Sequence, residues 1–570
     1  MPRLRDILTQ ALEWTRPSDG QRMLLWAALV GVGGALATLA FREGLVALEG
    51  WLYGTREGLV QAAIGLVWWQ RLLVPAVGGL LAGGVLLLAQ RLPQGEGRDG
   101  DYMEAVVLGR GRLGTRHSLL RALSSACSVV SGGAIGREGP MVQLAALAGS
   151  WAGHWRDLPL PRRRLLVACG AAAGLTTAYN APVAGALFIA EIVLQSLATD
   201  TLAPLLVAAV MAEVTLAVAG HATPLYLVRD VPTVGASATL ACAVLGLLAG
   251  LAAPVYLGLL DAAKALFARW HAPLPLQLAA GGLVVGALSI RAPQVWGNGF
   301  SVVSSMLVSP WTWQALLAVL VFKLLAVAAT TGSGAVGGIF TPTLFMGAVA
   351  GALFGLAMQA VAPGLLPLPA AIAIGMGALL AASTHAPLMS VLMIFEMTAD
   401  YAVVVPLMLA CVLAFSVSRL LRPASIYATS RAREAAVVPR LATAGALMRR
   451  ESMTIQPGQP VAELESRFLA GRWRHTYVLD AQGRFLGAVA LHDFTSFLKA
   501  PHDAAAPWPA VLLIADFPRL REDMPLWEVL DAFTRHPGER LPVVDGRGRL
   551  QGHVAKTDLV LMLREQLAVG

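Results

Sequence analysis

The segment best suited to chemistry is Gly136-Arg137-Glu138-Gly139-Pro140, which opens a run without Asp, Glu, Lys or Arg that reaches Trp155. Glycine lets the backbone approach an ion closely, and proline suits the first turn of a helix. The free N–H groups of a helix start carry about half a positive charge and bind anions. The segment therefore predicts an anion site at the N-terminus of a helix.

A second segment, Gly338-Ile339-Phe340-Thr341-Pro342, has the same construction without a charged side chain. Two such helix starts facing each other would hold a dehydrated halide by amide groups alone, without a fixed cation that would bind it too tightly for release. Glu138 is the odd residue in this arrangement. Its carboxylate either gates the site by occupying the same amide donors or caps its own helix, and the residues alone leave both interpretations open.

The composition places these segments in a membrane. Of 570 residues, 56% are hydrophobic and 14% are charged, against about 25% charged in soluble proteins. Residues 1–430 carry 25 Lys and Arg and 19 Asp and Glu, whereas residues 431–570 carry 18 and 16. We therefore expect a cytosolic segment (1–22), a multi-span body (23–430) and a water-soluble tail.

The net charge of +8 needs no nucleic-acid partner, because basic residues gather at the ends of apolar segments. Arg3 and Arg5 precede the first apolar run, Arg162–Arg164 separate two others, and Arg431 and Arg433 follow the last. The positive-inside rule then predicts a multi-pass plasma-membrane protein with both termini in the cytosol.

Several apolar runs are long enough to cross a bilayer, among them Met23–Phe41 and Leu165–Ala190. Residues 324–395 contain no Asp, Glu, Lys or Arg, but glycines and prolines interrupt them repeatedly. Unwound backbone at membrane depth survives only where protein buries it or where it lines a cavity. This stretch therefore predicts broken helices, which build ion sites in transporters.

An internal repeat relates the two halves of the body, at about 23–220 and 231–430. Residues 131–140 align without gaps on 333–342 and match at two glycines, a serine and a proline. Ala181-Pro182 with Glu191 matches Ala386-Pro387 with Glu396 at one offset, 205. Similarity does not determine the relative orientation of the halves, but inverted repeats with an odd number of crossings each would return both termini to one side.

The tail holds a second repeat, of period 65. Asp480, Gly483, Gly487, Val489 and Asp493 recur as Asp545, Gly548, Gly552, Val554 and Asp558. Each unit is typical of two strands around a turn followed by a helix. Over residues 441–567 the tail resembles a tandem pair of α+β CBS domains, at about 441–500 and 511–567.

The segments GREGP and GGIFTP, followed by Ser425-Ile426-Tyr427, resemble the CLC family of chloride channels and chloride/proton antiporters over about residues 20–430. The resemblance implies an all-α polytopic body with an inverted repeat of broken helices, assembled as a homodimer in a bacterial inner membrane. By this resemblance Glu138 is the external gate, and the amides of Ile339 and Phe340 bind the central chloride. The amides of Arg137, Gly139 and Thr341 lie nearer the outer site, and the Tyr427 hydroxyl closes the inner end.

Two departures from the family pattern bear on function. Gly97 stands where the family usually has a serine that binds the central anion, so the site has either lost a donor or gained a backbone amide. Ile192 stands where antiporters commonly have a glutamate that passes protons to the inside. Glu191 is one position away, about 100° around a helix, which favours a structural acid over a rerouted proton path.

These residues favour a chloride channel gated by Glu138, dependent on voltage and pH and modulated by the CBS pair. A chloride/proton antiporter with another internal acid is the close alternative. A CBS-gated divalent cation channel would need convergent acids, and an intramembrane enzyme a nucleophile–base or metal pair. We expect no metal and no cofactor besides a nucleotide at the CBS pair, which stays open because Ala490 and Ala555 replace the usual Ser or Thr before Asp493 and Asp558.

Overall fold

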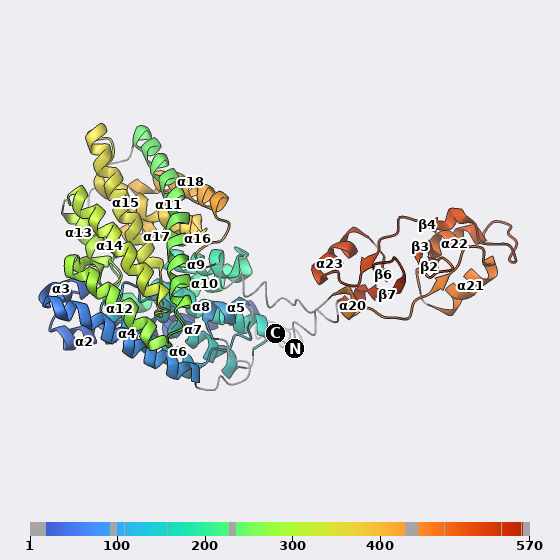
Figure 1. Cartoon of the computed structure of the whole chain (residues 1–570), viewed down its shortest axis with the longest axis horizontal. Helices are drawn as coiled ribbons and strands as arrows, with labels where there is room; N and C mark the ends of the chain where they lie inside the picture. The colour runs from blue at the N-terminus through green and yellow to red at the C-terminus, as the bar shows by residue number, and fades with distance from the viewer. Residues whose placement is uncertain are drawn as a thin grey trace, which may run out of the picture. The chain divides into compact units, whose positions relative to one another are not determined.

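The computed structural model describes residues 19–91, 100–107, 109–156, 158–226, 235–309, 311–427, 443–471, 473–536, 538–559 and 561. The chain divides into two compact units, residues 1–430 and 431–570. Figure 1 shows a bundle of helices in the first unit and mixed helices and strands in the second. The predicted fold classes of the body and the tail are thereby confirmed.

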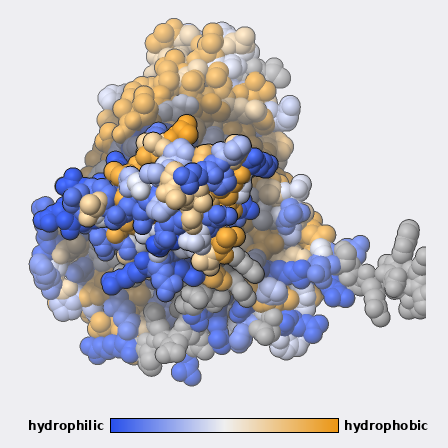
Figure 2. Space-filling view, turned by 90° about the vertical axis from the view of Figure 1, so that its right-hand side faces the viewer, coloured by the Kyte–Doolittle hydropathy of each residue, from blue (hydrophilic) through white to orange (hydrophobic). Residues whose placement is uncertain are grey.

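Helices make up the described part of the body, and eight of them are long and apolar enough to cross a membrane. Figure 2 shows broad hydrophobic regions on the surface, in orange, that a bilayer would cover. The first half contains α2 (Asp19–Tyr53), α3 (Leu59–Gly65), α4 (Trp68–Arg91), α5 (Tyr102–Val107), α6 (Thr115–Val130), α7 (Glu138–Trp155), α8 (Leu160–Tyr179), α9 (Pro182–Phe188), the π-helix η1 (Ile189–Leu194) and α10 (Thr199–Val218).

The second half repeats this order of long and short helices, except that no helix corresponds to α3 between the described helices α11 and α12. It contains α11 (Ala236–Arg269), α12 (Leu274–Arg291), the 3-10 turn η2 (Pro293–Val295), α13 (Phe300–Val308), α14 (Trp313–Gly332), α15 (Phe340–Val361), α16 (Leu368–Thr384), α17 (Pro387–Thr398), the 3-10 turn η3 (Tyr401–Val403) and α18 (Val404–Leu421).

The packing of α4 on α12 gives the orientation of the halves. A β-carbon on Gly79 of α4 would come within 2.3 Å of the Leu278 carbonyl oxygen, and one on Gly282 of α12 within 2.0 Å of the Pro75 carbonyl oxygen. Residue numbers rise along α4 as they fall along α12, so the two equivalent helices cross antiparallel. The repeat is therefore inverted, as the family resemblance implied.

The predicted broken helices are confirmed, and one predicted span is corrected. Leu165–Ala190 is two helices, because Asn180 ends α8 in the left-handed conformation (φ 52°) and Ala181-Pro182 starts α9. His385 does the same between α16 and α17 (φ 59°), at the equivalent position of the second half. A left-handed residue followed by proline stops a helix, since proline has no N–H to continue it.

The second unit holds two sheets with the same connectivity. β1 pairs parallel with β2, which pairs antiparallel with β3, and β5, β6 and β7 repeat this arrangement. Each antiparallel pair carries an irregularity at an equivalent place, between Val478 and Leu479 and between Val543 and Val544. The elements are α20 (Ala444–Leu447), β1 (Thr454–Ile455), α21 (Val461–Ala470), β2 (His475–Leu479), β3 (Phe485–Ala490), α22 (Leu491–Leu498), η4 (Ala510–Leu512), β4 (Leu513–Ile514), β5 (Leu520–Arg521), α23 (Leu526–Arg535), β6 (Arg540–Val544) and β7 (Leu550–Ala555).

Candidate functional site

The two candidate anion segments meet through their backbones. Each follows a glycine in the left-handed conformation, Gly132 (φ 93°) and Gly334 (φ 92°). The Gly136 N–H donates to the Gly338 carbonyl oxygen at 2.8 Å, and the Gly338 N–H donates to the Gly136 carbonyl oxygen at 2.9 Å. The helices α7 and α15 therefore begin at one place, so the partial positive charges of two helix starts converge there.

Glu138 bridges the two helix starts. It is the first residue of α7 and is only 5% exposed. Its Oε1 atom accepts a hydrogen bond from the Thr341 N–H at 2.9 Å and another from the Thr341 hydroxyl at 3.0 Å. The carboxylate thus occupies donors of the opposite helix rather than capping α7 alone.

Tyr179, which the sequence analysis missed, completes this network. Its hydroxyl lies 2.9 Å from the Thr341 hydroxyl oxygen. When the Thr341 hydroxyl donates to ionised Glu138, its proton is committed, so the Tyr179 O–H must be the donor of the second bond. The result is a buried chain of donors that ends on the carboxylate.

Close approach at this point depends on glycine. A β-carbon on Gly338 would lie 2.7 Å from the Glu138 carboxyl carbon, and one on Gly136 would lie 2.0 Å from a Glu138 carboxylate oxygen. Arg137 and Ile339 directly precede the two helices as their N-cap residues, and Gly139 lies next to Gly337. Since the first N–H groups of a helix have no acceptor within it, this cluster can bind a negative charge.

Aromatic rings extend from the site to the end of the body. Phe340 contacts Tyr179 and Phe188, with ring centroids 5.0 and 6.0 Å away. Phe188 in turn meets Tyr427 edge to face at 5.5 Å. The Ile426 N–H donates to the Ser383 carbonyl oxygen at 2.9 Å and so attaches the segment before Tyr427 to α16. The structure thus connects Tyr427 with the anion segments through Phe188.

Glu191 and Glu396 make reciprocal contacts between the halves. Glu191 Oε2 accepts a hydrogen bond from the Met389 N–H, in the first turn of α17, at 2.8 Å. Glu396 accepts hydrogen bonds from the Val183 and Ala184 N–H groups, in the first turn of α9, at 2.9 and 2.8 Å. Each acid therefore satisfies the helix start of the opposite half.

The helical phase used to place Glu191 needs correction. Residues 189–194 form a π-helix, so the turn of about 100° per residue expected of an α-helix does not apply there. The orientation of Glu191 follows instead from its bond to Met389. Ile192 is buried at 4% exposure, within the hydrophobic core of the body.

Lys323 is a second residue that the sequence analysis missed. It is fully buried, and its Nζ atom donates to the carbonyl oxygens of Val295 and Gly297 at 2.8 and 2.6 Å. These carbonyls flank Trp296, which leaves no room for a side chain on Gly132, since a β-carbon there would lie 2.3 Å from the indole. Lys323 therefore supports the loop that precedes Glu138. Its place as the last charge before residues 324–395 was the available signal.

Gly97 lies outside the described residues. The next helix along the chain is α5, whose Tyr102 N–H donates to the Gln143 Oε1 atom at 2.9 Å. Gln143 also donates through Nε2 to the Ser118 hydroxyl at 3.0 Å, so this side chain joins α5, α6 and α7. The hydrogen bonds attach the beginning of α5 to the helix that carries Glu138.

The two closing aspartates of the tail differ. Arg449 binds Asp558 with two nitrogens, including Nε at 3.0 Å, and thereby occupies the carboxylate. Asp493, its equivalent in the first unit, is exposed. His553 lies beside this pair at 3% exposure, and burial lowers its pKa to about 4. Among the described residues, no cluster of three His, Cys, Asp or Glu could hold a metal ion.

Comparisons with families and curated proteins agree with this geometry. The family model described as voltage gated chloride channel matches residues 78–419, and the CBS domain model matches 444–500 and 512–565. A ClcB-like chloride channel protein of Ralstonia nicotianae is 53% identical over 416 residues, which are 72% of this chain and 97% of the relative. A voltage-gated ClC-type chloride channel, ClcB, of Salmonella typhimurium is 45% identical over 71% of this chain and 98% of its own length.

Two solved structures share the fold of this chain at different levels of sequence identity. A slow cyanobacterial chloride/proton antiporter is 26% identical, with a TM-score of 0.65 over 74% of this chain and 99% of its own. A eukaryotic CLC transporter is 19% identical, with a TM-score of 0.61 over 94% of this chain and 98% of its own, which shows a shared fold.

Proposed function

The chain belongs to the CLC family of voltage-gated chloride channels and transporters, as a bacterial member with a C-terminal CBS pair, and we propose that it is a passive chloride channel gated by Glu138. Chloride transport follows from the family. Passive conduction and the residues that control it are the proposal.

The contact between Glu138 and Thr341 supports the gating role. A carboxylate and a chloride ion carry the same charge and compete for the same N–H and O–H donors. While Glu138 holds the Thr341 donors, an anion cannot use them. Protonation or rotation of Glu138 vacates them, which makes conduction dependent on pH and on voltage. Arg137, Gly139, Ile339 and Phe340 offer backbone N–H groups along the same path, and Tyr427 obstructs its inner end.

The observation that carries passive transport is the bond between Glu191 and the Met389 N–H. Proton coupling needs a titratable group that exchanges with the cytosol and reaches Glu138. Isoleucine at position 192 cannot titrate. Glu191, the adjacent acid, already accepts a hydrogen bond from the start of α17. If its side chain moved away to carry protons, the Met389 N–H would lose its acceptor, which is unfavourable.

The test is the reversal potential of the full-length protein in liposomes under an imposed pH gradient. We expect it to follow the chloride gradient alone. Glu191→Gln keeps an acceptor oxygen for Met389 and should leave this potential unchanged. Uphill proton movement driven by a chloride gradient would overturn passive transport.

A chloride/proton antiporter is the second candidate, favoured by the likeness to the cyanobacterial antiporter. In that case a chloride gradient would drive protons uphill across the membrane of wild-type vesicles. Glu191→Gln would abolish this proton movement while chloride still crossed. Proton movement measured in wild-type and Glu191→Gln vesicles therefore distinguishes a channel from an antiporter.

The assembly and location are further parts of the proposal. We expect a homodimer in the bacterial plasma membrane with both termini cytosolic. Exposed apolar residues on α10 and α18, such as Val210, Val214, Val405 and Val412, suit contact with a second copy. Light scattering of the detergent-solubilised protein should give the mass of two chains, and a mass of one chain would contradict the dimer.

A further inference from the structure

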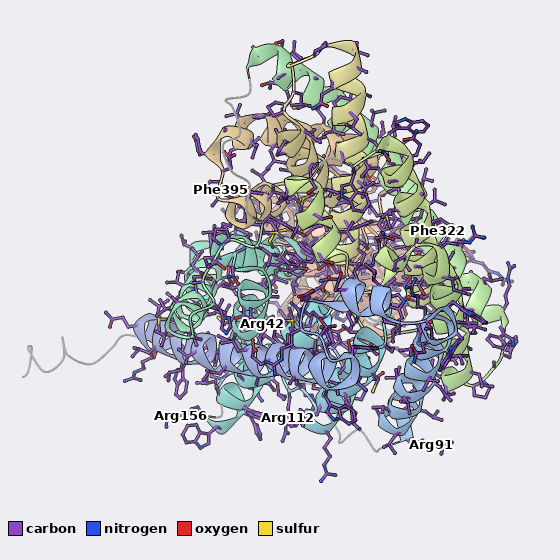
Figure 3. All side chains as sticks on the ribbon, turned by 90° about the vertical axis from the view of Figure 1, so that its left-hand side faces the viewer. Arg42, Arg91, Arg112, Arg156, Phe322 and Phe395 are labelled. Carbon is purple, nitrogen blue, oxygen red and sulfur yellow. The ribbon has the colours of Figure 1, made fainter. Side chains whose placement is uncertain are left out.

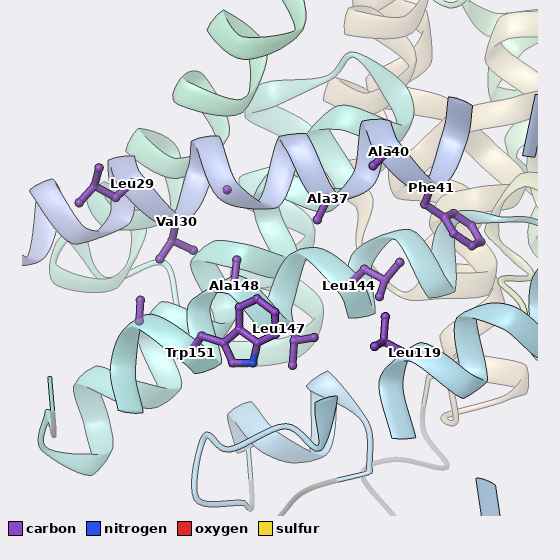
Figure 4. A pocket seen from close by; sticks show the side chains of 12 residues that line it. Leu29, Val30, Ala37, Ala40, Phe41, Leu119, Leu144, Leu147, Ala148 and Trp151 are labelled. Atoms are coloured by element: carbon purple, nitrogen blue, oxygen red, sulfur yellow. The ribbon is translucent and has the colours of Figure 1, made fainter. Parts of the chain in front are cut away.

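A hydrophobic groove of about 570 Å³ runs between α2 and α7 on the surface of the body. Figure 4 shows Leu29 and Val30 of α2 at one end, beside Ala148 and Trp151 of α7, and Phe41 near Leu144 at the other. Leu29 and Trp151 are 62% and 56% exposed. The groove therefore presents apolar walls to the hydrocarbon of a bilayer.

A basic pocket of about 230 Å³ lies beyond the groove, at the N-terminal end of α2 and just past the C-terminal end of α7. Arg22 and Trp26 of α2 line it, three to seven residues before Leu29, together with Arg156, four residues after Ala152 of α7. Arg162 at the start of α8 is the third arginine. Figure 3 shows Arg156 at the edge of the body. Because α2 lines both sites and Arg156 directly follows α7, which lines the groove, the pocket continues the groove.

The pocket carries a net positive charge. Among the described residues that line it, Asp19 is the one acid, and it pairs with Arg162 at 3.0 Å and with Arg22 at 3.9 Å. Three arginines against one carboxylate leave two positive charges among the described lining residues. The Arg156 guanidinium lies 5.4 Å from the centre of the Trp26 ring, which holds it at the junction of pocket and groove.

We propose that this composite site binds an anionic phospholipid of the surrounding membrane. The phosphate binds the arginines, which suit phosphate because guanidinium groups donate paired hydrogen bonds. An acyl chain lies in the groove. From Leu29 to Phe41 the groove follows α2 for about 18 Å, close to the roughly 15 Å depth of one leaflet. Tryptophan at such a junction is typical of the membrane interface.

The test measures lipid retained by full-length protein in native mass spectrometry, after exchange into mixed micelles with phosphatidylglycerol or phosphatidylcholine. The triple variant R22Q/R156Q/R162Q should retain about tenfold less phosphatidylglycerol than wild type, since each arginine near a membrane surface contributes to anionic-lipid binding. The matched control R91Q/R269Q/R291Q removes the same charge from the exposed ends of α4, α11 and α12 and should bind like wild type.

Two single variants keep the test decisive if the triple variant folds poorly. Arg156→Gln removes one guanidinium and should give a partial loss. Ala37→Phe fills the groove without changing charge, so long-chain phosphatidylglycerol should lose its advantage over a dihexanoyl form. Equal binding by the triple variant and its control would overturn the proposal. So would equal retention of phosphatidylcholine, or displacement of the lipid by inorganic phosphate at equal concentration.

Discussion

The membrane body and the CBS pair are each built from a repeat, and in each unit the two halves form hydrogen bonds with each other. In the body, Glu191 completes the start of α17 and Glu396 completes the start of α9. In the CBS pair, β4 leads into the second domain but adds to β3 of the first. Arg449 leads into the first domain and pairs through its backbone with His553 in β7 of the second. In each unit, backbone groups of one half therefore find their hydrogen-bond partners in the other half.

The two units differ in the surroundings of the position at which one repeat has a charged residue and the other an apolar one. Glu138 and Phe340 are equivalent in the body, and the charge of one meets the helix start of the other in a buried site. Arg449 and Ile514 are equivalent in the CBS pair, where the charged residue forms an ion pair at a partly exposed surface. Buried charges interact strongly and exposed pairs weakly. Symmetry therefore supplies the frame of both units, and we expect broken symmetry to matter far more in the body.

The largest effect is expected from Glu138→Gln. The amide is neutral at all pH values and competes poorly with chloride for the Thr341 donors, so flux in liposomes should rise at neutral pH and lose most of its pH dependence. Glu104→Gln, which changes an exposed acid on α5, is the control and should keep the wild-type profile. An unchanged pH profile in Glu138→Gln would refute the gate.

The reciprocal acids should have the next largest effect, on stability. Glu396→Ala leaves the Val183 and Ala184 N–H groups of α9 without their acceptor, and Glu191→Ala does the same to the Leu388 and Met389 N–H groups of α17, at about 1–3 kcal/mol for each group. Thermal unfolding in detergent should therefore place both alanine variants below wild type, by similar amounts. The matched glutamine variants keep an acceptor oxygen and should lose less. If Glu191→Ala kept full stability but lost transport, its structural role would be wrong.

Tyr427→Ala should change flux severalfold, because it removes both a hydroxyl donor and a ring packed against Phe188. Tyr427→Phe separates the two contributions, since it keeps the ring. We expect the alanine variant to raise flux and the phenylalanine variant to weaken chloride binding in calorimetry without raising flux. If neither variant changed either quantity, Tyr427 would not close the inner end.

Much of this architecture could be predicted from sequence, because helix starts, breaks and repeats are local patterns. Each anion segment, residues 136–140 and 338–342, holds its glycine and its proline within five consecutive positions, so the sequence alone indicates a helix start there. The contacts of Glu191 with Met389 and of Lys323 with the loop before Phe300 could not be predicted, since they join distant residues through packing. The π-helix at 189–194 also escaped, because its sequence resembles that of an α-helix.

In the CBS pair, His553 should make stability depend on pH. Its folded pKa of about 4 lies below the ordinary value of 6.5 because burial disfavours the charged ring. The unfolded chain therefore binds more protons between pH 6.5 and 4, so stability falls as pH decreases through this range, by on the order of 1–2 kcal/mol. Hydrogen exchange of residues 540–555 in the full-length protein should show this loss of protection. His553→Gln should flatten it, and an equal slope in both proteins would contradict the assignment.

The smallest effect on stability is expected from Arg449→Ala, because the arginine side chain is 62% exposed and surface ion pairs contribute about 1 kcal/mol or less. Its consequence for binding is sharper. A nucleotide whose ribose needs an aspartate meets an exposed Asp493 but an Asp558 already held by Arg449. Calorimetry of the full-length protein with ATP should therefore give at most one site per chain, lost in Asp493→Ala and kept in Asp558→Ala. Arg449→Ala should free the second carboxylate and strengthen binding there, whereas two equal sites in wild type would show that the ion pair does not block the nucleotide.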